Sequence, residues 1–220
     1  EYRSDNYHKL TFSMMYYYDA RFLLPFSHDE VVHGKATIMQ KMSGDYDGKF
    51  PQARALYMYM YAHPGKKLNF MGNEIGQLRE WDEKREQDWM LLDYPVHEGF
   101  AHFIKDLNRL YLEHSAFWEK DYSADGFQWI DCHQESKCIY VFQRNGKKES
   151  IISLFNFSDQ EQEYELNLPG VDKIRELLNS NLVVYGGTQK RKDGVKILKN
   201  GKITLELPAF SAVYYIQVPA

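Results

Sequence analysis

The chain has 220 residues, of which 44% are hydrophobic and 26% charged, a balance typical of a globular protein with one large or two modest domains. Its net charge of -4, from 27 basic and 31 acidic residues, creates no positive field for a polyanion, so we expect no nucleic-acid partner. The longest apolar run, residues 55–62, is far shorter than the ~20 residues that a bilayer-spanning helix requires, so we expect no membrane segment.

The number of cysteines gives an indication of the cellular compartment of the protein. Cys132 and Cys138 are too few for a disulfide framework, which favours a cytoplasmic location. A bridge between them stays open if they face each other across a hairpin. Residues 1–5 lack the pattern of a secretory signal, although a processed chain would have lost one. The sequence therefore predicts a cytoplasmic protein and leaves the state of the two thiols open.

Short apolar segments alternate with helical patterns in the first half of the chain, which predicts β/α units and a parallel sheet. Residues 22–26 are nearly all apolar, as expected of a strand buried on both faces, and residues 68–71 predict a second strand. Between them a helix is predicted to begin at Pro51 and to end at His63. Apolar spacing over 98–114 predicts the next helix.

From about residue 120 the pattern changes to short alternating segments separated by turns, which predicts a sandwich of seven or eight strands. Strands are predicted at these segments: 127–130, 139–142, 151–154, 164–168, 195–198, 203–205 and 212–217. The pairs Asn145-Gly146 and Asn200-Gly201 predict type I′ hairpin turns, because both residue types tolerate positive φ angles.

The first half contains too few strands for a complete sheet, because two parallel strands with their helices cannot bury both faces. We therefore expect residues 1–116 to be the last two β/α units of an eight-stranded (β/α)8 TIM barrel, followed by an antiparallel β-sandwich domain at 117–220. The predicted fold class is α/β plus all-β. Active sites of such barrels lie at the carboxyl ends of the strands, where polar turns follow both predicted strands.

The densest group of ionisable residues follows the first predicted strand, at residues 27–30. This placement favours a functional site, although His28 and Asp29 could also only cap a turn. A zinc site is excluded because His28 and His33 are five residues apart rather than four. A calcium loop at residues 45–48 is excluded because its glycine comes too early. The sequence therefore predicts no metal and no cofactor.

Several motifs follow one another in the order of one enzyme family. They lie at residues 10–12, 24–35, 41–45, 63–67, 70–74, 79–81, 106–111, 126–129, 156–158 and 185–187. On these motifs the chain resembles, over essentially its whole length, the C-terminal half of a 1,4-α-glucan (glycogen) branching enzyme of the α-amylase superfamily. Ser-His-Asp-Glu-Val-Val-His-Gly-Lys at 27–35 is highly specific, because general α-amylases usually have Asn before His-Asp.

The resemblance implies a retaining glycosyltransferase that cleaves an α-1,4-glucan and passes the segment to a 6-hydroxyl, making an α-1,6 branch in glycogen. It implies that Asp29 is the transition-state stabiliser and that His28 donates to the same sugar. The expected substrate-binding residues are Glu30, Glu74, Arg79 and Trp81. The nucleophile and the acid/base carboxyl group of this chemistry lie on earlier barrel strands in the family. The chain is therefore expected to be inactive without the missing N-terminal part of the same enzyme.

Departures from the family pattern are mild. Tyr7-His8 stands where many members have two histidines, and residues 52–54 replace a common Asn-Leu-Arg. Two alternatives remain open. The parent protein could be an α-glucan hydrolase or debranching relative. Alternatively, the chain could be a noncatalytic glucan-binding fragment, which the aromatic-rich predicted β domain favours.

Overall fold

The structure is a computed structural model that describes residues 3–190 and 194–219. Its α-helices are α1 (His8–Thr11), α2 (Tyr46–Ala62) and α3 (Pro95–Glu113). Its strands are β1 (Leu23–Phe26), β2 (Lys66–Asn69), β3 (Phe127–Gln134), β4 (Ile139–Asn145), β5 (Ser150–Asn156), β6 (Gln162–Asn167), β7 (Lys173–Asn179), β8 (Val195–Ile197), β9 (Lys202–Leu207) and β10 (Ser211–Gln217). The 3-10 turns are η1 (Phe12–Met15), η2 (Tyr17–Asp19), η3 (His28–Glu30), η4 (Asn73–Ile75), η5 (Trp89–Asp93), η6 (Ser115–Phe117), η7 (Ala124–Gly126), η8 (Glu135–Lys137) and η9 (Val183–Tyr185).

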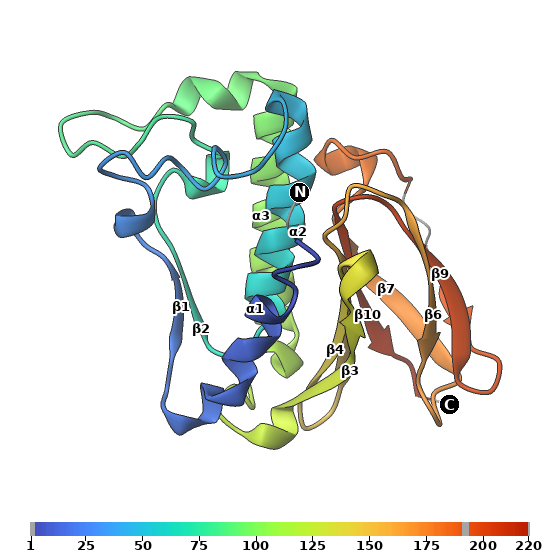
Figure 1. Cartoon of the computed structure of the whole chain (residues 1–220). Coiled ribbons are helices and arrows are strands. Elements are labelled where there is room, and N and C mark those ends of the chain that lie inside the picture. The colour runs from blue at the N-terminus through green and yellow to red at the C-terminus, as the bar shows by residue number, and fades with distance from the viewer. Residues whose placement is uncertain (1–2, 191–193, 220) are drawn as a thin grey trace.

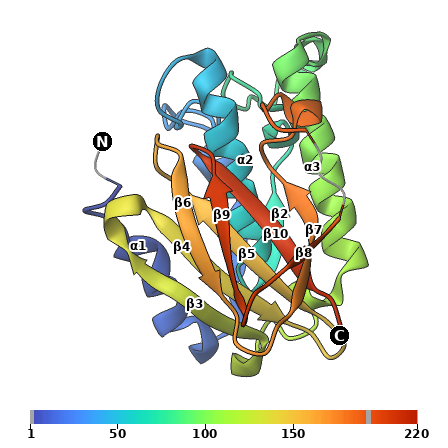
Figure 2. The same cartoon turned by 90° about the vertical axis from the view of Figure 1, so that its right-hand side faces the viewer.

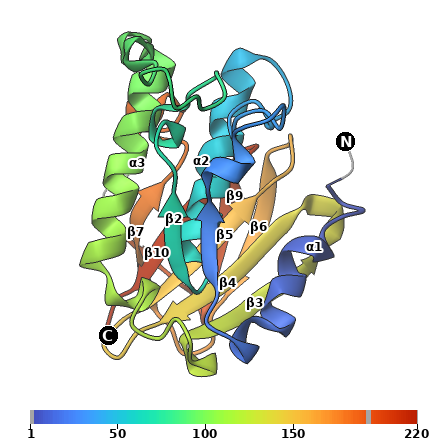
Figure 3. The same ribbon diagram turned by 90° about the vertical axis from the view of Figure 1, so that its left-hand side faces the viewer.

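β1 and β2 form a small parallel sheet in the first half. The register runs from Leu23 opposite Lys66 to Phe26 opposite Asn69. α2 connects the two strands and α3 follows β2, so the predicted order of strand, helix, strand and helix is confirmed. α2 and α3 stand between this sheet and the sheets of the second half (Figure 1), and β1 and β2 cross in front of them when the molecule is turned (Figure 3).

The two long helices begin earlier than the sequence predicts. α2 begins at Tyr46 rather than at Pro51, because the Asp45 carboxylate caps it by accepting a hydrogen bond of 2.9 Å from the Gly48 N–H. Pro51 therefore lies inside the helix. α3 begins at Pro95 rather than at residue 98. A proline is tolerated there because the N–H groups of the first helical turn have no acceptor within the helix. The predicted end of the first helix at His63 is confirmed.

The prediction that the first strand is buried on both faces is wrong. Leu23 is 57% exposed, and Leu68 of β2, which pairs with Pro25, is 40% exposed. The physical reason is that β1 has a single neighbour, β2, among the described residues. The apolar sequence of β1 thus fits a larger sheet than these two strands provide.

The second half is a β-sandwich, as predicted. One sheet has six strands in the order β3-β4-β5-β10-β7-β8, and β6 and β9 form a second, two-stranded sheet. Every pairing in both sheets is antiparallel. β6 and β9 cover the face of the six-stranded sheet that lies away from the helices (Figures 1 and 2). The described strands number eight, and β7 is the one that the sequence analysis missed.

One of the two predicted type I′ turns is present. Asn200 and Gly201 have φ angles of 52° and 77°. They close a turn in which Lys199 and Lys202 exchange two backbone hydrogen bonds, of 2.9 and 3.0 Å. The turn at Asn145-Gly146 is different, because neither residue has a positive φ. Asn145 pairs with Ser150 across a four-residue loop instead.

Two apolar cores lie on opposite faces of the six-stranded sheet. One lies between the two sheets and contains Val141, Leu154 and Val213 with their neighbours. The other packs α2 and α3 against the opposite face, where Phe142 and Tyr214 belong to the same cluster as the helical residues. β4, β5 and β10 are therefore buried on both faces, and the helices of the first half complete the packing of the second.

A buried ion pair in the second half anchors two elements of the first half. The Arg144 guanidinium on β4 lies 2.9 Å from a carboxylate oxygen of Asp121, and both side chains are at most 1% exposed. Arg144 also donates a 2.8 Å hydrogen bond to the carbonyl oxygen of Ala62, the last residue of α2. Lys66 on β2 lies 3.0 Å from the other oxygen of Asp121. These contacts fix the ends of α2 and β2 to the six-stranded sheet.

Cys132 and Cys138 are both free thiols, and no disulfide joins them. Among residues 3–190 and 194–219, no helix is both long and apolar enough to cross a membrane.

Candidate functional site

The predicted catalytic residues lie in one short turn, η3, at the carboxyl end of β1. Ser27 keeps an extended backbone, and His28, Asp29 and Glu30 then form a single 3-10 turn. A ring nitrogen of His28 lies 3.4 Å from a carboxylate oxygen of Asp29, and their side chains are 54% and 68% exposed. A parallel strand therefore delivers two exposed, ionisable side chains at its carboxyl end, where β/α barrels place their active sites.

Two aromatic rings lie next to His28. Its ring centroid is 5.8 Å from that of Phe70, just after β2, and 6.2 Å from that of Trp81. Phe70 and Trp81 meet edge to face at 5.3 Å. Edge-to-face packing of this kind is favourable beyond simple burial and restricts ring orientation. The structure thus brings two of the predicted residues, His28 and Trp81, into one aromatic group.

An open hollow of about 500 Å³ adjoins this group. Its lining residues are His28, Val32, His33, Arg79, Glu80, Trp81, Asp82, Glu83 and Arg85. The hollow is bounded by the segment after η3 on one side and by the 79–85 segment on the other. We call this space the η3 hollow. Carboxylates, guanidinium groups and an indole ring in one concave surface suit the hydroxyls and apolar faces of sugars.

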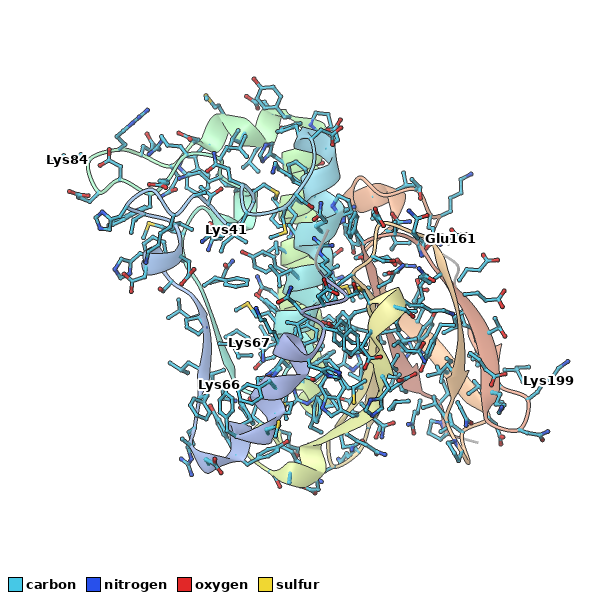
Figure 4. The ribbon with its side chains drawn as sticks, in the orientation of Figure 1. Lys41, Lys66, Lys67, Lys84, Glu161 and Lys199 are labelled. Atoms are coloured by element: carbon cyan, nitrogen blue, oxygen red, sulfur yellow. The ribbon has the colours of Figure 1, made fainter. Side chains whose placement is uncertain are left out.

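Arg79 is occupied by its own loop. Its guanidinium donates to a carboxylate oxygen of Asp88 at 3.0 Å and to the carbonyl oxygen of Glu86 at 2.8 Å. Its Nε donates to the same oxygen of Asp88 at 3.3 Å, and a fourth hydrogen bond of 3.2 Å reaches the carbonyl of Glu80. Arg79 therefore closes the 79–88 loop on itself, and the tip of that loop, around Lys84, projects away from the sheets (Figure 4).

Glu74 lies apart from the other predicted residues. It belongs to η4 after β2 and lines a separate open hollow of about 590 Å³, which also contains Lys66, Lys67 and Asn69 of β2. Lys67 donates hydrogen bonds to the carbonyl oxygens of His63 and Gly65, and burial lowers its pKa well below the usual value. Lys66 and Lys67 mark this strand in Figure 4.

Glu30 is held by Lys41. The ammonium group donates to the backbone carbonyl of Glu30 and lies 3.4 Å from its carboxylate. The Glu30 side chain is still 50% exposed. Glu30 is therefore at the rim of the turn, and it is not among the residues that line the η3 hollow.

Sequence reasoning did not single out Glu80. Its two carboxylate oxygens accept hydrogen bonds from the backbone N–H groups of Gly34, at 3.0 Å, and Ala36, at 2.8 Å. These hydrogen bonds are the main reason that the pKa of Glu80 is lowered, and the charges of His33 and Lys41 lower it further. The partners are 44 and 46 residues distant, so spacing along the chain gives no signal for them.

Within residues 3–190 and 194–219, no group of three or more histidine, cysteine, aspartate or glutamate side chains is arranged to hold a metal ion.

Curated bacterial enzymes match this chain over most of its length. The 1,4-alpha-glucan branching enzyme of Oceanobacillus iheyensis is 44% identical over 195 residues, which are 87% of this chain and 31% of that enzyme. The enzyme of the same name from Aquifex aeolicus is 42% identical over 223 residues, covering 97% of this chain and 35% of that enzyme. The chain is a homologue of the 1,4-alpha-glucan branching enzymes. It spans about a third of the length of these branching-enzyme relatives.

Two further comparisons concern the fold. The profile described as "Alpha amylase, C-terminal all-beta domain" matches residues 129–217, which run from β3 to the end of β10. A crystal structure of an Anoxybacillus alpha-amylase superposes with a TM-score of 0.52 at 18% identity, covering 78% of this chain and 33% of that one. This likeness concerns the fold, and it agrees with the β-sandwich of the second half. The branching-enzyme relatives carry the argument about function.

Proposed function

We propose that this chain is part of a 1,4-α-glucan branching enzyme. The enzyme cleaves an α-1,4-glucan and transfers the released segment to a 6-hydroxyl group, which forms an α-1,6 branch in glycogen. The observation that carries the proposal is Asp29, exposed in a turn at the carboxyl end of a parallel strand, in a chain 42% to 44% identical to branching enzymes.

We propose that residues 1–116 are the last two β/α units of a (β/α)8 barrel and that residues 117–220 form the C-terminal sandwich domain. The parallel pairing of β1 with β2 and the exposure of Leu23 and Leu68 support this, because neighbouring barrel strands would cover both residues. The partner of this surface is then the N-terminal part of the same enzyme.

In this proposal Asp29 acts on the transition state. Retaining glycoside chemistry uses a nucleophilic carboxylate and an acid/base carboxyl group ~5 to 5.5 Å apart, and both belong to the N-terminal part. Asp29 accepts hydrogen bonds from the hydroxyls beside the reacting carbon, and these strengthen as the sugar ring distorts. His28 donates to the same sugar. Interactions that strengthen only in the transition state raise the rate rather than the affinity.

The other predicted residues differ in their support. Trp81 lines the η3 hollow next to His28, which suits contact with a sugar face. Glu30 at the rim suits contact with a donor or acceptor chain. Glu74 would bind glucan only where its separate hollow joins the cleft. The four hydrogen bonds of Arg79 inside its loop favour a role in shaping the cleft wall.

We also propose a cytoplasmic location, supported by the two free thiols of Cys132 and Cys138 in a chain with no other cysteine.

Incubation with linear amylose tests the proposal. The full-length enzyme is expected to form new α-1,6 linkages, detected by NMR, without a matching rise in reducing ends. The 220-residue chain alone is expected to form none, because it lacks the nucleophile. Release of reducing ends without α-1,6 linkages by the full-length protein would favour a hydrolase or debranching relative. Branching by the isolated chain would refute the division of catalytic groups.

A further inference from the structure

Glu80 joins the two sides of the η3 hollow. We propose that it is a positioning residue for the branching reaction: it holds the 31–36 segment as a fixed wall of the glucan cleft and thereby sets the affinity for glucan. This inference rests on the proposed function, since it assigns a role in that same site.

Three hydrogen bonds connect the two walls. Gly34 and Ala36 each donate a backbone N–H to one oxygen of the Glu80 carboxylate, at 3.0 and 2.8 Å. The Trp81 N–H donates to the carbonyl oxygen of Val31 at 3.0 Å. The 31–36 segment begins directly after η3. A displacement of this wall would therefore occur right beside Asp29.

The backbone of the segment needs such support. His33 and Ala36 have φ angles of 59° and 64°, which residues other than glycine rarely adopt. Such conformations cost free energy and persist where the surroundings fix them. Glu80 supplies this fixation with both oxygens, on either side of exposed Lys35. Because His33 lines the η3 hollow, the shape of the hollow depends on the Glu80 carboxylate.

The kinetic consequence differs from that of a catalytic residue. A cleft wall contacts the glucan in the ground state and in the transition state alike, and loss of such uniform binding raises KM with little change in kcat. Asp29, by contrast, is proposed to act mainly in the transition state. The two residues therefore predict opposite divisions between KM and kcat.

Limited trypsin digestion of the 220-residue chain tests the contact itself. In Glu80→Gln one oxygen becomes an NH2 group that cannot accept a hydrogen bond, so cleavage after Lys35 is expected to accelerate about tenfold through local opening. Glu86→Gln, which changes an exposed carboxylate of the same loop, is the matched control and is expected to leave the rate unchanged. An unchanged rate in Glu80→Gln would overturn the inference.

Kinetics of the full-length enzyme on amylose test the consequence. Glu80→Gln is expected to raise KM about tenfold and to keep kcat within about threefold of wild type. Glu80→Asp keeps the negative charge on a shorter side chain, so its KM is expected to lie between those of wild type and Glu80→Gln. An unchanged KM, or a loss of kcat alone, would overturn the inference. Failure of the wild-type enzyme to branch would instead refute the proposed function, and the digestion would still decide whether Glu80 fixes the segment.

Discussion

His63 ends α2 as a buried imidazole between two polar neighbours. Its ring nitrogens lie 2.9 Å from the Ser13 hydroxyl oxygen and 2.8 Å from the Pro64 carbonyl oxygen, and the residue is 4% exposed. Burial, with a smaller effect of the charge on Lys67, lowers its pKa to about 4. The folded protein therefore holds this histidine neutral at pH values where an unfolded chain would protonate it.

This shift predicts acid sensitivity. Between the ordinary pKa of about 6.5 and the folded pKa of about 4, the unfolded state binds more protons, so stability falls as the pH falls through this window. His63 is expected to contribute about 2 to 3 kcal/mol of the loss between pH 7 and pH 4.5. Urea unfolding at both pH values should show a loss smaller by this amount in His63→Gln. Exposed His8→Gln is the control, and equal losses in His63→Gln and wild type would contradict the assignment.

The site was predictable from sequence only in part. Asp29 and His28 stand out because a strand and a specific motif surround them, and the structure places them at the expected strand end. Arg79 was expected to bind substrate. In the structure it donates to Asp88 and to the Glu86 carbonyl, and these contacts depend on the fold of the loop, which the sequence pattern does not specify. Glu80 was missed because its partners are distant backbone N–H groups, which carry no residue-type signal.

Some turns and strands follow from the local sequence, whereas others depend on tertiary pairing. Asn200-Gly201 forms the predicted turn, whereas Asn145-Gly146 does not, because the β4–β5 register places four residues in the connection. β7 was missed because Lys173–Asn179 mixes charged and apolar residues without clean alternation. Ile174 and Arg175, near its start, pair with β10 on one side and with β8 on the other. Such pairing is a tertiary effect that short-range patterns do not encode.

Two glycines with nearly the same backbone allow the turn to be tested. Gly201 has a φ of 77°, and an added Cβ would lie 2.6 Å from the Leu168 carbonyl oxygen. Gly170 has a φ of 80°, and no described atom would lie within 4 Å of its Cβ. Gly170→Ala is expected to cost about 1 to 2 kcal/mol of unfolding free energy from the backbone alone, and Gly201→Ala at least about 1 kcal/mol more from the contact. Equal costs in urea unfolding would show that the contact relaxes freely.

The whole molecule is held together by a six-stranded sheet that is covered on both faces. Phe142 and Tyr214 pack on α2 and α3, and the Tyr214 hydroxyl donates to the carbonyl oxygen of Met58 inside α2. Arg54 of α2, whose pKa burial lowers to about 10, donates to the Ser180 carbonyl oxygen at 2.7 Å. Alternating apolar and polar residues in the individual strands predicted the sandwich. The helices that cover the other face of the six-stranded sheet come from the first half of the chain, so this packing depends on both halves.

This shared core predicts how residues 117–220 behave alone. Without the helices, the large side chains of one sheet face lie in water, and each loses about 1.5 to 3 kcal/mol of burial. The isolated segment is expected to bind the dye ANS and to aggregate on size-exclusion chromatography, whereas the full-length enzyme stays monodisperse. A monomeric segment with cooperative unfolding would show that the helical cover is dispensable.

We propose that Asp29 lies beside a cleft completed by the N-terminal part of the enzyme. The most direct test is kcat of the full-length enzyme on amylose, measured for Asp29→Asn. Asp19→Asn, another exposed aspartate in a 3-10 turn, is the matched control. The account predicts that kcat falls at least ~100-fold in Asp29→Asn, with KM and melting temperature close to wild type, because transition-state contacts are lost. A kcat for Asp29→Asn equal to that of Asp19→Asn and of wild type would contradict it.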